Sequence, residues 1–444
     1  MKKPNILFLI SHDTGRYLGC YDRPVKSPEI DRLASSGVRF DQAFCPTPTC
    51  SPSRGSILTG LYPHNNGLIG LAHYEFGINE DVSTLPMALQ QGGYETTLIG
   101  FSHETIGHTE RGTYSSNTKL GYQRYEKIEG SRAPQVADKA IEYLKEKSKD
   151  SSKPFFANIG FWETHRTFDE YEPFADEIEE VTVPEYLPDT EKVRKEIALM
   201  NGSVKVLDEA IGRIINTLKE TGLDENTILI YTTDHGIAFP RAKGTMKEAG
   251  LETALIFYSP MLFGENVTTN EIICNIDLMP TILDLAGLPI PENLDGKSFA
   301  PFLLKETEAT ERNEFFFELT WHDNYHPMRG VRTKKYKYVR NFEDGPEIYL
   351  PMDIHKSPSG EEVRQKFYVP NAKEELYDLE KDPLEETNLI ENPHYATIGE
   401  ELRAKVNNWM EKTNDPLLNG RVPGVASKSW ALETEKGNAY KGRK

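Results

Sequence analysis

Apolar and polar residues follow one another along this chain in blocks that predict strands and helices in alternation. Strands are predicted at residues 95–99, 155–160 and 226–232, and the run at 5–10 is apolar without a break. Such runs are typical of strands in a parallel sheet that is covered on both faces. Segments with helical spacing separate them, including 133–147 and 191–221. The alternation predicts an α/β fold with a mostly parallel sheet between layers of helices.

The pattern changes beyond residue 306. Residues 315–317, 330–333 and 336–340 are short apolar or alternating runs, and the last two are close enough for antiparallel pairing. A final amphipathic helix is predicted over 398–412. We therefore expect two units, with the main one at 1–306 and a smaller α+β subdomain containing an antiparallel sheet at 307–444.

Polar side chains follow each of the four predicted parallel strands. In chain order they are Asp13, His103, His165, and Asp234 with His235. Functional groups gather at the carboxyl ends of parallel strands, so we expect these residues to meet at one edge of the sheet. The carboxylates of Asp13 and Asp234 are ligands that suit a divalent cation.

A further candidate site lies between the first two strands, where Cys50-Ser-Pro-Ser-Arg54-Gly precedes an apolar run and Gly60. Ser53 predicts a helix cap and Gly60 predicts the helix end. Cys50 would then lie just ahead of a helix N-terminus, where backbone N–H groups favour anions.

Composition limits the partners of the chain. Its 444 residues carry a formal charge of −18, which argues against nucleic acid and against long anionic polymers. An anionic substrate would need a local group of cations, and we expect a short or terminal unit. No apolar run is long enough to span a membrane.

Compartment can be judged from the N-terminus and the cysteines. The apolar run at 5–10 is shorter than a signal-peptide core, and His12 and Asp13 follow at once. Four cysteines without regular spacing form no disulfide framework. Both features predict a cytoplasmic protein, and the oligomeric state is left open.

The segment Cys50-x-Pro52-Ser53-Arg54, with Leu58-Thr59-Gly60 after it, resembles the signature of the sulfatase family. The resemblance implies an alkaline-phosphatase-like fold. It also implies that a formylglycine-generating enzyme oxidises Cys50 to formylglycine, whose hydrated aldehyde would be the catalytic nucleophile.

The same resemblance implies a metal site. Its ligands would be Asp13, Asp234, His235 and the modified Cys50, and the expected ion is Ca²⁺. His12 stands where the family usually has a second aspartate. Because imidazole suits calcium less well than a carboxylate does, Mn²⁺ or Zn²⁺ are alternatives.

Further catalytic roles follow from the resemblance. Arg54 would hold the formylglycine, and Lys243 of Lys-Gly-Thr would bind a sulfate oxygen. His165, or Lys243 as the second candidate, would protonate the leaving group, and His103 would act on the second hydroxyl of the nucleophile. A second sulfate-binding lysine of the family is absent, because Phe101 stands there. The candidates to replace its charge are Arg166, Lys247 and Arg329.

Four segments, at 60–71, 161–166, 234–240 and 322–329, look closest to the sulfamidase branch, the N-sulfoglucosamine sulfohydrolases. This implies a small sulfated saccharide substrate of the heparan or glycosaminoglycan type, carrying a sulfamate or a sulfate ester. The candidate sugar contacts are His322, Asp323, Arg329 and Arg166.

Three other functions are kept as alternatives. The first is a phosphonate or phosphodiester hydrolase with the same fold and nucleophile. The second is a catalytically silent glycan-binding relative, which His12 and Phe101 motivate. A plain thiol enzyme is the third, although no Cys-His pairing accounts for Pro52-Ser53-Arg54.

Overall fold

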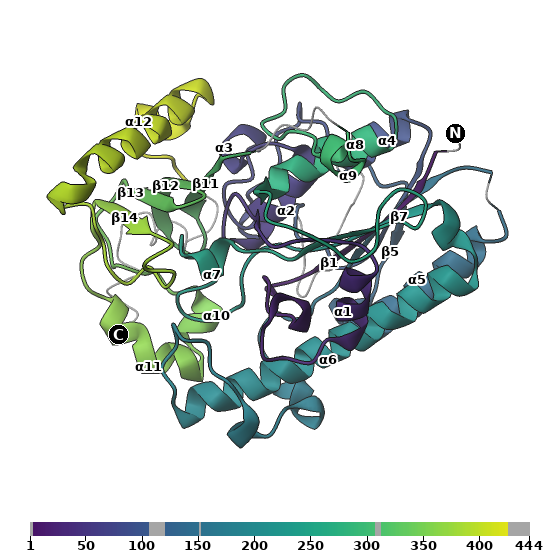
Figure 1. Cartoon of the computed structure of the whole chain (residues 1–444), viewed down its shortest axis with the longest axis horizontal. Helices are drawn as coiled ribbons and strands as arrows, with labels where there is room; N and C mark the ends of the chain where they lie inside the picture. The colour runs from purple at the N-terminus through teal and green to yellow at the C-terminus, as the bar shows by residue number, and fades with distance from the viewer. Residues whose placement is uncertain (1–2, 106–119, 151, 307–311, 425–444) are drawn as a thin grey trace.

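A computed structural model describes residues 3–105, 120–150, 152–306 and 312–424. The centre of the molecule is an eight-stranded sheet (Figure 1). In spatial order its strands are β5 (Arg124–Glu126), β4 (Glu95–Gly100), β6 (Phe155–Gly160), β1 (Asn5–Ser11), β7 (Thr227–Thr233), β8 (Leu255–Tyr258), β2 (Val38–Phe40) and β9 (Val267–Thr269). Only β8 is antiparallel to its neighbours, so the predicted mostly parallel sheet is confirmed.

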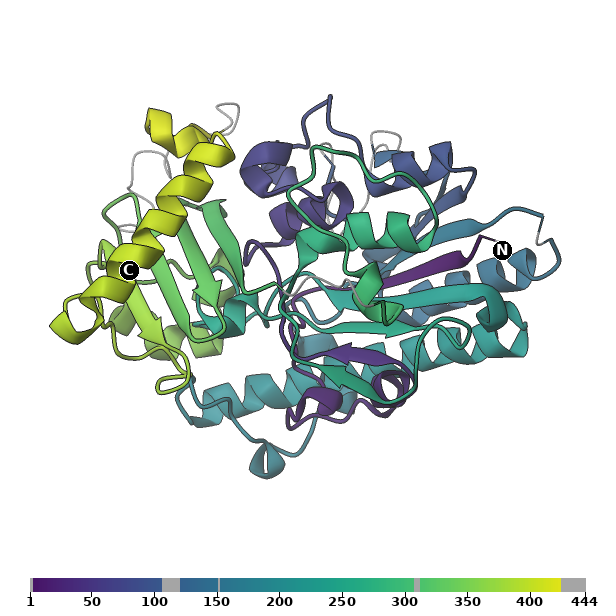
Figure 2. The ribbon, with the colours of Figure 1, turned by 45° about the horizontal axis from the view of Figure 1, so that its top comes forward.

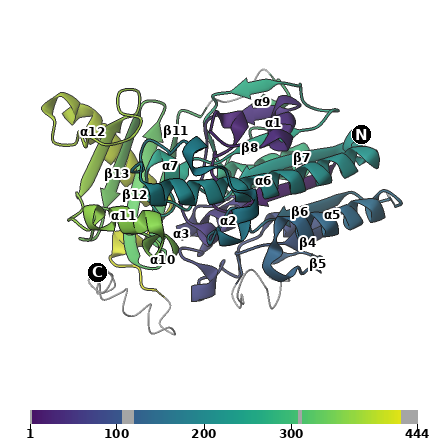
Figure 3. The same cartoon turned by 90° about the horizontal axis from the view of Figure 1, so that it is seen from below.

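Helices cover both faces of this sheet because β1 is apolar on both sides. Leu7 and Leu9 pack with α1 (Pro28–Ser35), α5 (Ala133–Lys147) and α6 (Glu191–Glu220), and the last two helices run side by side (Figure 3). Ile6, Phe8 and Ile10 pack on the other face, against α2 (Cys50–Thr59), α4 (Leu85–Gln91), α8 (Leu278–Leu285) and α9 (Ala300–Leu303). This alternation follows from the two-residue period of a strand.

The chain also forms several shorter elements. They are β3 (Ala43–Phe44), which pairs with β10 (Ile273–Cys274), and the helices α3 (Pro63–Asn66), α7 (Glu248–Leu251), α10 (Met352–His355) and α11 (Pro358–Phe367).

A second sheet lies toward the C-terminus (Figure 2). It is antiparallel throughout, with β11 (Glu314–Trp321), β12 (Tyr325–Thr333), β13 (Tyr336–Asn341) and β14 (Glu374–Asp378) in that order, and α12 (Ala396–Lys412) packs on it. Its core continues into the main unit, where Phe315 stacks on Phe44 with 4.7 Å between ring centroids. The expected antiparallel sheet is confirmed. The division into 1–306 and 307–444 stays a proposal, and residues 307–311 lie outside the described part of the chain.

The register of the main sheet places several strand ends at one edge. Ser11 at the end of β1 pairs with Thr233 at the end of β7, and Gly100 at the end of β4 pairs with Gly160 at the end of β6. The residues that follow these strands are therefore brought together. No helix within the described ranges is both long and apolar enough to cross a bilayer.

Candidate active site

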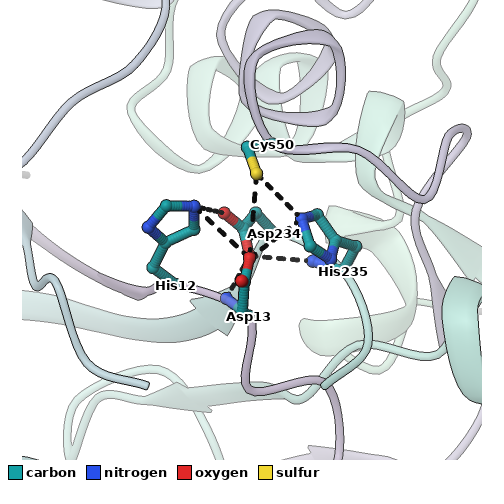
Figure 4. A group of neighbouring side chains, drawn as sticks. All are labelled: His12, Asp13, Cys50, Asp234 and His235. Carbon is teal, nitrogen blue, oxygen red and sulfur yellow. Dashed lines mark hydrogen bonds and ion pairs between the residues drawn. The ribbon is translucent and has the colours of Figure 1, made fainter. Parts of the chain in front are cut away.

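The residues that follow β1 and β7 meet the N-terminus of α2 at this edge of the sheet. Oδ1 of Asp13 lies 3.7 Å from Sγ of Cys50 and 3.1 Å from Nε2 of His235. Nε2 of His235 is also 3.3 Å from Sγ of Cys50. Figure 4 shows Cys50 facing Asp13, with His12 and His235 on opposite sides. The predicted meeting of these side chains is observed.

The start of α2 differs from the predicted one. The helix begins at Cys50, with Thr49 before it, and Gly60 ends it in the left-handed conformation as expected. Ser53 does not cap the helix, because its hydroxyl donates to the backbone oxygen of Asp234 at 2.5 Å. Cys50 is therefore the first helical residue, and the helix is fixed to the end of β7.

Arg54 is buried beneath the site and bound to Asp234. Its Nε donates to Oδ2 of Asp234 at 2.9 Å, and its guanidinium lies over the ring of Phe101 at 4.8 Å. Arg54 therefore holds Asp234 in place. Its link to residue 50 runs through the Asp234 carboxylate.

His12 completes a group of five possible metal ligands. One ligand atom from each of His12, Asp13, Cys50, Asp234 and His235 lies within 4.8 Å of all the others. The His12 ring is buried, stacks on Phe101 at 4.6 Å, and makes no hydrogen bond at either nitrogen. Its Nε2 lies 3.3 Å from Oδ1 of Asp13 and 3.6 Å from Oδ2 of Asp234. Burial, and then nearby His165 and Arg54, hold the pKa of His12 well below its usual value, so the ring is neutral and can donate a lone pair.

These residues fit a bound divalent cation. A buried, neutral imidazole that makes no hydrogen bond and points at two carboxylates is an arrangement that a metal ion would satisfy. Apart from Cys50, the group has two nitrogen donors, His12 and His235, and two carboxylates, Asp13 and Asp234. This set suits manganese or zinc better than calcium, which takes six to eight oxygens. The donor set therefore supports a metal site and departs from the oxygen-rich set expected for calcium.

The thiol of Cys50 is poorly suited to act as a nucleophile itself. Burial raises the pKa of Cys50 well above its usual value, although Lys243 acts in the opposite direction. The thiolate is the reactive form of cysteine. A buried thiol that keeps its proton does not support the alternative of a plain thiol enzyme.

Lys243 lies on the other side of Asp13 and has three close neighbours. Its Nζ is 2.7 Å from Oδ2 of Asp13, 2.9 Å from Oδ2 of Asp353 and 3.2 Å from Nε2 of His165. Burial opposes the charge, but Asp13 and Asp353 hold the pKa of Lys243 well above its usual value. Lys243 is therefore a fixed cation beside His165.

Asp353 was not expected from the sequence. It belongs to the one-turn helix α10, which the chain reaches only after the second sheet has begun, and no local motif marks it. The only available signal was its position between Pro351 and Ser357-Pro358, which predicts a turn that could present a side chain.

His103 lies at the edge of the site, next to a second unexpected residue. Its Nε2 is 2.9 Å from Nδ1 of His73, and the two rings are stacked. The centroid of the His103 ring lies 6.1 Å from that of His12. His103 is thus near the metal ligands without belonging to their group.

Arg166 and Lys247 are engaged away from the site, which corrects two expectations. Arg166 pairs with Glu196, donates to the backbone oxygen of Ala238 at 2.6 Å, and lies over Phe239 at 4.6 Å. Lys247 donates to the hydroxyl of Tyr377 at 2.7 Å. Neither replaces the missing sulfate-binding lysine, and the expected sugar contact of Arg166 is not supported.

Arg329 is also misassigned by the sequence. It is fully buried on β12, where it pairs with Asp415 at 2.5 Å and Glu318 at 3.1 Å. Its position within the second sheet leaves no surface for a sugar. The expected substrate contact is therefore corrected to a structural ion pair.

Replacing Arg329 with alanine tests this correction. The change leaves Asp415 and Glu318 buried without their cation, so we expect a loss of about 3–5 kcal/mol in the free energy of unfolding. Urea unfolding measures it. Arg403→Ala is a matched control, because Arg403 is partly exposed and pairs with Glu374, and it should cost less than about 1 kcal/mol. An unchanged stability with a raised KM would restore the substrate contact.

His322 and Asp323 lie close to α10. Nδ1 of His322 is 3.3 Å from Oδ2 of Asp323, and the same carboxylate accepts a hydrogen bond from the backbone N–H of Met352. The other oxygen of Asp323 accepts from the hydroxyl of Tyr74 at 3.2 Å. Asp323 therefore fixes the start of α10, and with it the position of Asp353.

Comparisons with known proteins agree with this geometry. Residues 4–288 match the sequence model described as Sulfatase, and residues 239–365 match the one described as N-sulphoglucosamine sulphohydrolase, C-terminal. The chain is 30% identical to an ulvan-active sulfatase of Formosa agariphila, over 98% of this chain and 84% of the relative. It is 27% identical to the human N-sulphoglucosamine sulphohydrolase, over 93% of this chain and 91% of the relative.

Solved structures confirm the expected fold. One is a protein in complex with its substrate D-glucosamine-2-N,6-O-disulfate, which superposes with a TM-score of 0.71 at 22% identity. The match covers 93% of this chain and 99% of that protein.

Proposed function

Since this chain belongs to the sulfatase family, we propose that it removes the N-sulfo group from a glucosamine unit of a glycosaminoglycan-type saccharide. As a family member it is a sulfuric ester hydrolase. The N-sulfoglucosamine substrate is the finer part of the proposal. One observation carries it: the match to the C-terminal sulphohydrolase model spans 239–365, which includes both Lys243 and Asp353 of the site.

We propose that Cys50 is converted to formylglycine by a maturing enzyme. The Sγ atom of Cys50 then marks the place of the oxygen atoms that conversion would introduce. A formylglycine hydrate would supply an oxygen nucleophile for sulfur. Support comes from the position of Cys50 at the start of α2, where backbone N–H groups favour developing negative charge.

We propose that one divalent ion is held by Asp13, Asp234, His235, His12 and the modified residue 50. When bound, the ion would lower the pKa of a coordinated hydroxyl and polarise the sulfuryl oxygens. The nitrogen donors favour Mn²⁺ or Zn²⁺ over Ca²⁺. Arg54 would keep Asp234 oriented toward the ion, because it occupies Oδ2 of that carboxylate.

The remaining roles follow from position. Lys243 is a permanent cation that can bind a sulfuryl oxygen and stabilise charge in the transition state. Nδ1 of His165 is 2.6 Å from the backbone oxygen of Arg166. With the proton on Nδ1, Nε2 turns a lone pair toward Lys243, so it can take up a proton and then pass it to the leaving group. The His103 ring lies 6.1 Å from the His12 ring, and its Nε2 can exchange a proton with Nδ1 of His73.

The decisive test is sulfate release from N-sulfoglucosamine by protein produced together with a formylglycine-generating enzyme. The mass of the tryptic peptide that contains Cys50 reports whether –CH₂SH has become –CHO. We expect conversion, together with turnover of N-sulfoglucosamine. Converted protein that cleaves only an aryl phosphonate would favour the phosphonate hydrolase, and converted protein that binds the sugar without turnover would favour the silent relative.

A further inference from the structure

Asp353 brings a carboxylate into the site from the C-terminal part of the chain. Its Oδ2 is 2.9 Å from Nζ of Lys243 and 3.8 Å from Nε2 of His165. Its Oδ1 accepts the backbone N–H of Ile354 at 3.0 Å, which fixes the side chain on α10. The Asp353 side chain is 24% exposed, whereas that of Asp13 is 0% exposed. Of these two carboxylate partners of Lys243, only Asp353 can meet a substrate.

The two oxygens of Asp13 show on which side of the substrate's sulfur atom Asp353 would lie. Oδ1 faces the nucleophile side, 3.7 Å from Cys50 and 3.1 Å from His235. Oδ2 faces the opposite side, 2.7 Å from Lys243 and 3.7 Å from His165. In an in-line displacement the leaving group departs opposite the nucleophile. Asp353, which contacts Lys243 and His165, therefore borders the position of the leaving group.

A carboxylate at that position affects oxygen and nitrogen leaving groups differently. When a sulfate ester is cleaved, the bridging oxygen gains negative charge, which a nearby carboxylate repels. The nitrogen of a sulfamate can take a proton before cleavage and become positive. A nearby carboxylate attracts that charge, so the same side chain disfavours one leaving group and favours the other.

We propose that Asp353 adapts this site to a nitrogen leaving group by stabilising the protonated nitrogen of a sulfamate; the inference rests on the proposed function. A proton from water, relayed by Nε2 of His165, is added to the sulfamate nitrogen. The oxygen nucleophile at residue 50 loses its proton to water and forms a bond to sulfur while the S–N bond breaks. The electron pair of that bond stays on nitrogen, which leaves as a neutral amine and then takes a second proton from water. The sulfo group then leaves residue 50 as sulfate when the second hydroxyl of the hydrate loses its proton and the aldehyde re-forms.

Electrostatics in the free site agree with this role. Burial acts to raise the pKa of Asp353, but Lys243 and His165 hold it well below its usual value. Asp353 is therefore ionised at neutral pH.

The substitution Asp353→Asn tests the inference, because it removes the charge and keeps the shape. We expect kcat/KM for N-sulfoglucosamine to fall by about 10²-fold, as when one aligned charge partner is removed from a transition state. For a 6-O-sulfated glucosamine it should change by less than about threefold, or rise. An equal fall on both substrates would overturn the inference and make Asp353 only a counter-ion of Lys243. Wild-type protein that releases sulfate from neither substrate would contradict the proposed function instead.

A binding measurement keeps the inference testable without turnover. Glucosamine carries an ammonium group, whereas N-acetylglucosamine is neutral at the same nitrogen. Calorimetry should show that the wild-type protein binds glucosamine more tightly than N-acetylglucosamine. In Asp353→Asn the ratio of the two affinities should fall by about tenfold. If the wild-type protein cleaves no O-sulfate, the two kcat/KM values cannot be compared, and the binding measurement tests the inference in their place. An unchanged ratio of glucosamine affinity to N-acetylglucosamine affinity would contradict it.

Glu361→Gln is a matched control on the neighbouring helix α11. Glu361 forms an exposed ion pair with Lys192 at 3.3 Å and lies outside the site. The same change from carboxylate to amide should leave both kcat/KM values and the glucosamine preference unchanged.

Asp353→Asn should still fold, because Lys243 keeps its ion pair with Asp13 at 2.7 Å. A thermal unfolding curve of the variant verifies this.

Discussion

Changing Cys50 to alanine is expected to abolish sulfate release, lowering kcat by on the order of 10⁴-fold or more. A methyl group cannot be converted to an aldehyde and offers no atom that can attack sulfur. The other four metal ligands and Lys243 stay in place, so binding of the intact substrate should fall far less than kcat. Sulfate release at saturating substrate, together with calorimetric binding, separates these two effects.

Cys45→Ala provides the control for this substitution. Cys45 is buried like Cys50, lies five residues earlier in the same segment, and has its Sγ 3.8 Å from the backbone oxygen of Gly250, outside the group of metal ligands. The two variants remove the same atom from similar surroundings. Cys45→Ala should therefore lose stability about as much as Cys50→Ala and keep kcat within about twofold. Activity that survives in Cys50→Ala would show that the nucleophile lies elsewhere.

Much of the site could be predicted from the sequence because it depends on local pattern. Continuous apolar runs identify parallel strands, and the ends of parallel strands meet at one edge. Asp13 and Asp234 follow β1 and β7 directly, so their meeting follows from the strand order alone. Cys50 joins them because α2 starts at the same edge, although the cap predicted at Ser53 lies four residues after the observed one at Thr49.

The rest of the site depends on contacts between distant segments. Asp353 meets Lys243 across 110 residues, and Arg329 meets Asp415 across 86. Nothing in the local sequence distinguishes an arginine that faces a substrate from one that neutralises a buried carboxylate. Arg329 and Arg166 were therefore assigned to the sugar, whereas both are held by acidic partners inside the protein.

Phe101 illustrates the same limit. As a departure from the family motif it indicated a missing cation, and the sequence offered three basic residues as replacements. In the structure Phe101 is buried between Arg54 and the ring of His12. Its role is to pack two site residues, and the charge of the family lysine is not replaced by Arg166, Lys247 or Arg329.

Removing the divalent ion with a chelator is expected to abolish binding of sulfate as well as turnover. The site has three carboxylates (Asp13, Asp234 and Asp353) and two cations (Arg54 and Lys243). These five side chains together carry one net negative charge without the ion and one net positive charge with it. At an effective dielectric constant of 20, two charges 4 Å apart interact by about 4 kcal/mol, equivalent to roughly 10³-fold in affinity.

Calorimetric titration of inorganic sulfate into metal-loaded and chelated protein measures this dependence. We expect binding only in the loaded form, and Mn²⁺ or Zn²⁺ should restore it at lower concentration than Ca²⁺ because two of the ligands are imidazoles. His12→Asp exchanges a nitrogen donor for a carboxylate and should shift the preference toward Ca²⁺. Equal sulfate affinity in both forms would mean that Lys243 is the principal anion-binding group, although it is already shared by Asp13 and Asp353. The ion would then act only in activating the nucleophile, and the net charge of the site would not govern substrate binding.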